Sequence, residues 1–363
     1  MTPSDGASPV DRLWAVVPAG GAGKRLWPLS RAGKPKFLLD LTGSGRTLIQ
    51  ATVDRLTPLV GERVVVVTGA AHEEAVRRQL PEVDRVIAEP SPRDSMAAIG
   101  LAAAQLERED PDALIGSFAA DHVITDEAAF AASVREAAEV ADDGLLVTIG
   151  IQPTYAGTGF GYVRGGDALA GHATAVSVAE FVEKPDGPTA QVYLESGEYR
   201  WNGGIFVVRA STLLDLLAEH HPELASGLRA IAADPDSMGA RWPGLTRIAI
   251  DYAVAEPAAA TGRVAMVPGP FGWEDLGDFA SLAALLPGDA EDVKVLGDAS
   301  LVVTRGSSGL VVPAAGRTVA VVGLEDVVVV DTGDALLVTT YAHAQQVKAV
   351  PEALEREGRQ ELT

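Results

Sequence analysis

The feature that most constrains this chain is a short apolar run that passes directly into a glycine-rich segment near the N-terminus. Residues 14–17 read Trp-Ala-Val-Val, and the run stops at Pro18, ahead of Gly20, Gly21 and Gly23. A buried strand that ends in a glycine-rich loop has this pattern. Glycines let main-chain N–H groups approach an anion closely and allow unusual backbone angles. The segment therefore predicts a strand with an anion-binding loop at its carboxyl end.

Basic residues follow the glycines, with no acid among them: Lys24, Arg25, Arg31, Lys34 and Lys36. The whole chain has 29 Lys and Arg against 50 Asp and Glu, so its net charge is −21. A basic cluster in an acidic chain indicates a small polyanionic ligand. It argues against nucleic acid as a partner, because binding a phosphate backbone needs an extended basic surface.

Two common phosphate-binding motifs do not fit this segment. A Walker loop needs Ser or Thr after Gly-Lys, where the chain has Arg25, and an earlier glycine where it has Pro18. A dinucleotide fingerprint needs a third small residue at the position of Leu26. Neither a P-loop ATPase nor a Rossmann dehydrogenase is indicated.

Residues 21–36 instead read Gly-x-Gly-x-Arg-Leu-x-Pro-Leu-Ser-Arg, followed by Pro35-Lys36. This pattern resembles the signature of the sugar-1-phosphate nucleotidyltransferases, and Trp27 resembles the mannose-1-phosphate guanylyltransferase variant of it. The resemblance implies that the loop binds a nucleoside triphosphate through Gly20, Gly21, Gly23 and Lys24, and that Arg25 and Lys36 are catalytic. The alternative is a glycine turn beside a solvated basic face.

Composition bounds the remaining chemistry. The 363 residues are 47% apolar, as in a globular protein, and contain no cysteine, which excludes disulfides, thiolate catalysis and cysteine-ligated metals. The six histidines lack zinc-site spacing, so carboxylates are the remaining metal ligands. No apolar run is long enough to cross a membrane, and Met1 to Asp11 lacks a signal-peptide pattern. We expect a cytoplasmic protein without a membrane partner.

Helical and strand-like patterns alternate along the first part of the chain. Helices are predicted over 47–56, 72–80, 96–106 and 128–140, and strands over 64–67, 86–88, 114–118 and 145–151. This alternation predicts a Rossmann-like, doubly wound, mixed or parallel α/β sheet, which binds ligands at the carboxyl ends of its strands. Further on, we expect strands over 175–182 and 263–267, and helices over 212–219, capped by Ser211, and 248–256.

The segment Pro287-Gly288-Asp289 marks the predicted domain boundary, which gives a catalytic domain over 1–287 and a C-terminal domain over 288–363. Beyond it, short apolar runs recur every eight to ten residues at 301–303, 310–312, 319–322, 327–330 and 336–338. Such spacing predicts a small β-solenoid-like domain or a sandwich, followed by a helix over 345–357. Its valine-rich faces make us expect a homodimer.

Two polar segments follow predicted strands in the first half. The first, over 88–95, contains Arg93, Asp94 and Ser95; either Asp94 or Ser95 could simply cap the next helix. In the resembling family this segment helps to bind the nucleotide. The second contains Asp121, directly after the apolar run 114–118. Taken alone it could cap a turn, but the family's corresponding Ala-Asp-His motif holds magnesium.

Three further motifs follow in the order that the family has them. Gly161 and Tyr162 lie in a glycine-rich turn, Glu183 and Lys184 in Phe-Val-Glu-Lys-Pro, and Asn202 and Gly204 in Trp-Asn-Gly-Gly-Ile-Phe. An amide beside glycines suits sugar hydroxyls, although each segment could be only a turn. The resemblance implies that these six residues bind the sugar phosphate, and that Asp275 in Gly-Trp-Glu-Asp-Leu-Gly is the second metal ligand.

The reaction that the resemblance implies is transfer of GMP from GTP to α-D-mannose 1-phosphate, which forms GDP-mannose and pyrophosphate. Mg²⁺ on Asp121 and Asp275 would assist it. Transfer to another sugar 1-phosphate, such as glucose or a heptose, or use of another base is a neighbouring alternative. A non-catalytic regulatory subunit that binds a nucleotide sugar is an alternative of a different class.

Overall fold

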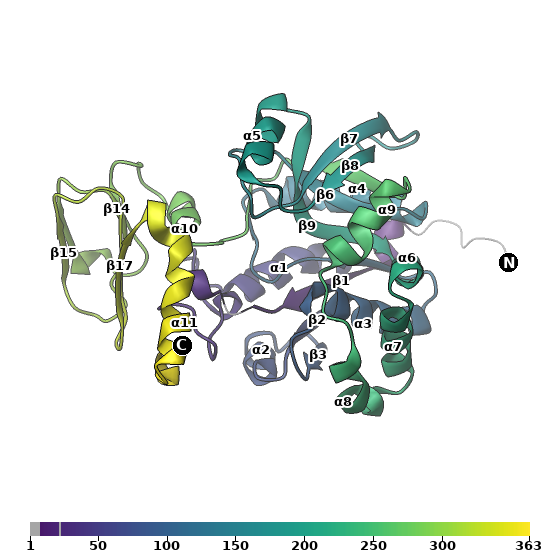
Figure 1. Cartoon of the computed structure of the whole chain (residues 1–363), viewed down its shortest axis with the longest axis horizontal. Coiled ribbons are helices and arrows are strands. Elements are labelled where there is room, and N and C mark those ends of the chain that lie inside the picture. Colours follow the sequence, from purple (N-terminus) through teal and green to yellow (C-terminus); the bar gives the residue numbers. More distant parts are fainter. Residues whose placement is uncertain (1–7, 22) are drawn as a thin grey trace. The chain divides into compact units, whose positions relative to one another are not determined.

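The computed structural model describes residues 8–21 and 23–363 (Figure 1), so only part of the segment Met1–Asp11 falls within it. The chain forms two compact units. Unit 1 contains the chain up to Gly20 together with Thr52–Ala120 and Ile124–Trp273. Unit 2 contains Gly21–Ala51, Asp121–Val123 and Glu274–Thr363. The domain boundary after residue 287 stays a prediction.

Unit 1 is built on one nine-stranded sheet with the order β3-β2-β1-β4-β9-β6-β10-β8-β7. Strands β1 to β4 pair in parallel, as do β6 and β10, whereas β9, β8 and β7 run antiparallel to their neighbours. The strands are β1 (Leu13–Ala19), β2 (Val64–Gly69), β3 (Arg85–Glu89), β4 (Leu114–Ser117), β6 (Leu146–Ile151), β7 (Tyr162–Ala168), β8 (Val176–Val182), β9 (Tyr199–Arg209) and β10 (Val264–Pro268). The predicted mixed α/β sheet is confirmed.

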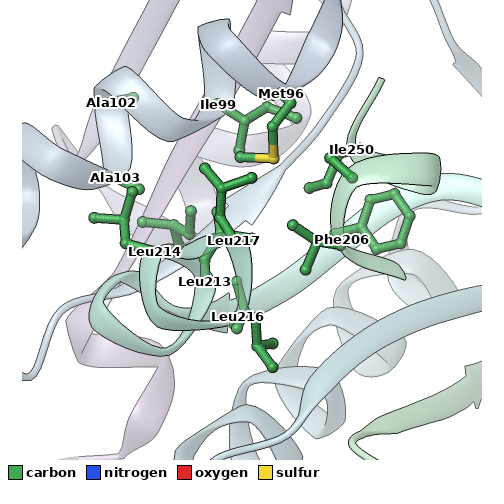
Figure 2. Packing of buried hydrophobic residues seen from close by; sticks show 14 of the residues in the cluster. Met96, Ile99, Ala102, Ala103, Phe206, Leu213, Leu214, Leu216, Leu217 and Ile250 are labelled. Atoms are coloured by element: carbon green, nitrogen blue, oxygen red, sulfur yellow. The ribbon is translucent and has the colours of Figure 1, made fainter. Parts of the chain in front are cut away.

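Most helices that lie wholly in unit 1 bury small or aliphatic side chains, whereas the short helix Met238–Arg241 buries none. The helices of this unit are α2 (Glu73–Gln79), α3 (Asp94–Glu109), α4 (Glu127–Asp142), α5 (Gly187–Ser196), α6 (Ala210–His220), α7 (Pro222–Ala233), α8 (Met238–Arg241) and α9 (Glu256–Ala260). Figure 2 shows α3 side chains such as Met96 and Ile99 beside Leu213 and Leu217 of α6. Both helices share a buried cluster with β-strand residues such as Phe206, so burial of apolar surface fixes this layer.

Two helix starts differ from the predictions. Helix α3 begins at Asp94, its N-cap is Arg93, and no side chain caps it. Asp94 has a φ of +66°, and the Ser95 hydroxyl accepts the Ile250 N–H instead. Helix α6 begins at Ala210, so Ser211 lies inside it and does not cap it. Both capping predictions are wrong.

A third difference concerns the helix expected over 248–256. The chain instead forms a π-helical turn, Asp251–Ala255, which continues directly into α9. A π turn closes i→i+5 hydrogen bonds and is rare in proteins. The Glu256 N–H donates to the Asp251 carbonyl in this way.

Unit 2 contains the β-rich tail, with β12 (Val293–Val295), β13 (Val302–Arg305), β14 (Gly309–Val312), β15 (Val319–Val322), β16 (Val327–Asp331) and β17 (Leu336–Thr340). Strands β12, β14 and β16 pair in parallel, and so do β13 and β15, which is a solenoid arrangement. The expected terminal helix over 345–357 is divided into a 3₁₀ helix, Tyr341–Lys348, and α11 (Ala349–Arg356).

The signature segment is packed into the core of unit 2. Leu26 and Trp27 share a buried cluster with α10 (Phe279–Leu285), β14, β16 and Leu354 of α11, which Figure 1 shows beside the solenoid strands. Helix α1 (Leu48–Val60) begins in this unit and continues into unit 1, and the short strands β5 (Val123–Ile124) and β11 (Trp273–Glu274) lie at the changes of unit along the chain. In the part of the chain that the structure describes, no helix has the length and apolarity needed to cross a bilayer.

Candidate functional site

The glycine-rich loop after β1 adopts backbone angles that require glycine. Gly21 and Gly23 have φ of +83° and +63°. A Cβ on Gly23 would lie 2.9 Å from Ser30 Oγ and 3.0 Å from Lys36 Cβ, so Gly23 also allows close packing. Gly20 is exposed with open space around it, and Ala22 lies outside the described residues. In the described part of the loop, Gly21 and Gly23 thus have left-handed backbone angles, and Gly20 and Gly21 have open space around them.

Two cations at the end of the loop have different surroundings. Lys24, Arg25 and Leu26 form a single 3₁₀ turn. Lys24 Nζ lies 3.2 Å from Glu355 Oε1 in α11, and Trp27 next to the turn donates its indole N–H to the Leu362 carbonyl at 2.7 Å. Arg25 is exposed and forms no hydrogen bond or ion pair within the described chain. Its guanidinium is available to an anion.

Lys36 contacts both predicted metal aspartates in unit 2, Asp121 through its carboxylate and Asp275 through its main chain. Its ammonium lies 3.0 Å from Asp121 Oδ2 and donates to the Asp275 carbonyl oxygen at 2.8 Å, although Asp121 and Asp275 are far apart in the sequence. The Lys36 and Asp121 side chains are only 15% and 18% exposed. The Asp275 Oδ1 accepts the Gly277 N–H at 3.1 Å, which fixes its orientation. Three residues predicted from separate motifs thus share one cluster.

The chemistry of this cluster suits a hard divalent cation. Asp121 and Asp275 offer only oxygen ligands, which magnesium prefers, and phosphate oxygens and water normally complete such a site. No group of three or more His, Cys, Asp or Glu side chains with metal-ligand geometry occurs among the described residues, so the protein would supply few ligands. Burial and the neighbouring Asp275 raise the pKa of Glu274 to about 7. The donor set fits an ion shared with a phosphate.

The segment predicted to bind the nucleotide in unit 1 is held by main-chain contacts. Arg93 donates to the carbonyl oxygens of Trp242 and Pro243, and the Ser95 hydroxyl accepts the Ile250 N–H at 3.0 Å. Asp94 is exposed and accepts the Ser95 N–H. Arg93 and Ser95 therefore act structurally in this conformation, and a nucleotide role for the three residues stays a prediction.

The predicted sugar-phosphate residues of unit 1 do come together. Lys184 follows β8 with a φ of +50° and bonds through its ammonium to Glu183 Oε1. The Glu183 side chain is 4% exposed, and its Oε2 has no hydrogen-bond partner among the described residues. A Cβ on Gly161 would lie 2.4 Å from that oxygen, so a larger residue there would force the Glu183 carboxylate to move. The Asn202 N–H donates to the Gly161 carbonyl at 2.8 Å.

Charges in this cluster shift one another. Burial, followed by the charge of Asp251, raises the pKa of Glu183. Burial is the largest single influence on the pKa of Lys184 and works to lower it, but the hydrogen bond to Glu183 and the nearby acidic groups together outweigh burial, so the pKa is raised. Lys184 therefore stays cationic near neutral pH and is half exposed, which suits binding of a phosphate.

The other two residues of this prediction contribute differently. Gly204 has a φ of +66° and donates its N–H to Asn202 Oδ1 at 3.2 Å. Tyr162 is fully buried, and its ring lies 5.4 Å from that of Tyr193. Tyr162 therefore has no surface for a ligand in this conformation, and its predicted role stays a prediction.

Sequence reasoning missed the acids behind Asn202 and Glu183. The Asn202 Nδ2 donates to Asp251 Oδ1 at 2.7 Å, and the Glu183 N–H donates to Glu256 Oε1 at 2.9 Å. Both acids were placed on a predicted helix but given no role. One signal in the sequence could have indicated Asp251: it lies inside the apolar run 248–255, where a side chain exposed to solvent is not expected.

Comparisons with known proteins agree with this arrangement. Residues 14–291 match the nucleotidyl transferase family model, and residues 290–354 match the model of a mannoseP isomerase/GMP-like β-helix domain. The chain is 40% identical to mannose-1-phosphate guanylyltransferase of Escherichia coli K12 and 38% identical to mannose-1-phosphate guanylyltransferase ManC of Salmonella typhimurium LT2. Each alignment covers 96% of this chain and 75% of the relative.

A solved structure shares the fold over nearly the full length. It is the crystal structure of a protein named mannose-1-phosphate geranyltransferase from Thermus thermophilus, at a TM-score of 0.86 and 33% identity. The similarity covers 95% of this chain and 99% of that one. The expected resemblance is thereby confirmed: this chain belongs to the mannose-1-phosphate guanylyltransferase family of nucleotidyl transferases.

Proposed function

We propose that this protein transfers GMP from GTP to α-D-mannose 1-phosphate and releases pyrophosphate, with GDP-mannose as product. The guanylyltransferase relatives, 36–40% identical to this chain, support the substrate pair. The structural observation that carries the proposal is the cluster of Lys36, Asp121 and Asp275, because it joins one cation and two acids from three separate motifs.

The chemistry requires positioning more than proton transfer. A phosphate oxygen of the sugar phosphate attacks the α-phosphorus of GTP, and the bond to the pyrophosphate oxygen breaks. The attacking oxygen is already ionised near neutral pH, so no general base is needed. The main barrier is repulsion between two polyanions, which fixed cations and N–H donors reduce.

The residues of unit 2 would act on the triphosphate. The N–H groups of Gly21 and Gly23 would line the phosphates, and Arg25, which has no partner among the described residues, would neutralise their charge. Lys24 would take part once it leaves Glu355. Lys36 would keep Asp121 and Asp275 in place and stabilise charge that develops on the phosphates.

Members of this nucleotidyltransferase family generally use a divalent metal, and we propose Mg²⁺ for this chain. Asp121 and Asp275 would hold it. When bound, the ion would polarise the α-phosphate and help to neutralise the triphosphate. Asp275 is already oriented for this role by the Gly277 N–H.

The residues of unit 1 would bind the second substrate. Lys184, half exposed, would bind the phosphate of mannose 1-phosphate, and Glu183 and Asn202 would contact sugar hydroxyls. Gly161 and Gly204 would allow the close approach, and a contact by Tyr162 remains part of the proposal. A nucleotide contact by Gly20, Arg93, Asp94 and Ser95 also remains part of the proposal, as do a homodimer and a cytoplasmic location.

The test is pyrophosphate release with Mg²⁺, measured for four nucleoside triphosphates against mannose, glucose and heptose 1-phosphates. Release that is strongest with GTP and mannose 1-phosphate is the expected result. Release with another pair would retain the mechanism and change the substrate. No release with any pair, together with tight binding of GDP-mannose, would refute the enzyme and favour a regulatory nucleotide-sugar-binding subunit.

A further inference from the structure

The side chain of Asn202 is almost fully used by the protein itself. Its Oδ1 accepts hydrogen bonds from the Thr148 hydroxyl at 2.8 Å and from the Gly204 N–H at 3.2 Å. Its Nδ2 donates to Asp251 Oδ1 at 2.7 Å, and the residue is 7% exposed. Because an amide oxygen accepts two hydrogen bonds and its nitrogen donates two, only one N–H of Asn202 is left for a ligand. Asn202 alone cannot accept from a sugar hydroxyl.

Asp251 lies next in this chain of contacts and has an unused acceptor. Its Oδ1 is bonded to Asn202, whereas its Oδ2 receives no hydrogen bond from another residue in the described chain. The residue as a whole keeps some exposed surface, and burial of its carboxyl raises the pKa of Asp251. Asp251 acts electrostatically on Glu183 and Lys184, which places its carboxylate near both.

The π-helical turn explains how this acid reaches the cluster. In an α-helix, residues five positions apart point about 140° apart, since each residue turns about 100°. The π turn Asp251–Ala255 brings Asp251 and Glu256 closer to one face, because it closes i→i+5 hydrogen bonds. Both acids indeed contact neighbouring residues of the cluster, Asn202 and the main chain of Glu183. Single π turns occur frequently at functional sites.

We propose that Asp251 is a specificity-determining residue, whose Oδ2 accepts a hydrogen bond from one hydroxyl of the sugar ring while its Oδ1 orients Asn202. The inference rests on the proposed function, because it requires a sugar 1-phosphate with its phosphate on Lys184. A carboxylate accepts but does not donate when ionised, so it selects a hydroxyl at one position over a hydrogen there. Glu183 would keep its hydrogen bond to Lys184 through Oε1 and have its unpartnered Oε2 left for the sugar contact already proposed.

The substitution Asp251→Asn separates direct contact from positioning. The Asn side chain keeps an oxygen for Asn202 Nδ2 and replaces Oδ2 by an N–H₂ group. We expect kcat/KM for mannose 1-phosphate to fall about 10- to 100-fold, the usual effect of losing a hydrogen bond to a charged group, with KM for GTP unchanged. The matched control is Asp215→Asn, an exposed acid of α6 in the same unit bound to Arg229, which should leave both constants unchanged.

The decisive measurement is a scan with 2-, 3-, 4- and 6-deoxymannose 1-phosphates. The wild-type enzyme should lose about 10- to 100-fold in kcat/KM with one analogue, and Asp251→Asn should lose nothing further with that analogue. An Asp251→Asn enzyme that discriminates among the analogues as the wild type does would overturn the proposal. The proposal would also be overturned if the wild-type enzyme used all four analogues equally, and that measurement does not depend on the folding of any variant.

Failure of the proposed function is distinguishable from failure of this inference. If the wild-type protein makes no GDP-mannose, the function fails, and the scan is repeated as calorimetric binding of the four deoxy sugar phosphates. If the wild-type protein binds one analogue more weakly and Asp251→Asn does not show this loss, the role of Asp251 is still supported. Equal binding of all analogues would refute it.

Discussion

Glu89 at the end of β3 is an acid whose burial should make stability depend on pH. It is partly buried, and its Oε1 has no hydrogen-bond partner among the described residues. Burial raises the pKa of Glu89 from 4.5 to about 7, because charging the carboxylate away from water is unfavourable. We predict that Glu89→Gln stabilises unit 1 more at pH 8 than at pH 5.

The sign follows from the number of protons that each state binds. Between pH 4.5 and about 7 the folded chain keeps a proton on Glu89 that the unfolded chain has lost, so stability decreases as pH rises through this range. The shift of about 2.5 units corresponds to at most about 3.4 kcal/mol at 1.36 kcal/mol per unit. Because the side chain is partly exposed, solvent screening reduces this to about 1–2 kcal/mol. Gln cannot ionise and avoids that cost.

The assay is urea unfolding at pH 5, 6, 7 and 8, followed by tryptophan fluorescence. It reports mainly on unit 1, which contains every tryptophan except Trp27: Trp14, Trp201, Trp242 and Trp273. The free energy of unfolding of Glu89→Gln should exceed that of the wild type by about 1–2 kcal/mol at pH 8, and the difference should fall to less than about half of that at pH 5, which lies just above the unfolded value of 4.5.

The matched control is Glu219→Gln in α6. Arg263 holds the pKa of Glu219 below its usual range, so this carboxylate is ionised in folded and unfolded chains alike from pH 5 to 8. The effect of Glu219→Gln should therefore be the same at every pH tested. A difference between Glu89→Gln and wild type that also stays constant from pH 5 to 8 would refute the reasoning.

Three further predictions concern the loop and the metal. Arg25→Ala should lower kcat/KM by about two to four powers of ten, because it removes a cation that the described chain leaves unpaired; a near-normal rate in steady-state kinetics would contradict the loop assignment. Asp275→Ala should abolish the dependence of the rate on magnesium, and an unchanged metal titration would exclude it as a ligand. Gly23→Ala should destabilise unit 2 by about 1–3 kcal/mol in thermal unfolding, because Gly23 has a positive φ and a Cβ there would contact Lys36. The control Gly33→Ala, at a position with open space and no positive φ, should leave thermal unfolding unchanged.

Strands, the mixed sheet and the solenoid-like tail could be predicted from the sequence, because their signals are local. The run Val64–Val67 and the evenly spaced valine runs of the tail each identify a strand without knowledge of its neighbours. Helix starts were less predictable. Ser95 and Ser211 have the side chains of good caps, but Ser95 bonds to Ile250, far along the chain, and α6 begins one residue before Ser211.

The site followed the same division between local and distant signals. Lys36, Asp121 and Asp275 were identified by motif, and the structure brings them together. Asp251 was missed because its role depends on a π turn and on Asn202, 49 residues earlier, neither of which leaves a local pattern. The predicted boundary after residue 287 depends on the single segment Pro287-Gly288-Asp289. Unit 2 consists of three stretches that are separated along the chain, and a local pattern cannot indicate such a unit.

The contacts of Lys24 with Glu355 and of Trp27 with Leu362 couple the glycine-rich loop to the last residues of unit 2. Coupling of this kind is reciprocal in free energy. If a triphosphate draws Lys24 away from Glu355, it weakens the attachment of α11. The free energy by which it does so equals the free energy by which the Lys24–Glu355 contact opposes nucleotide binding. Hydrogen exchange in residues 349–363 should therefore respond to a nucleotide bound at the loop, so the tail can serve as a reporter of occupancy.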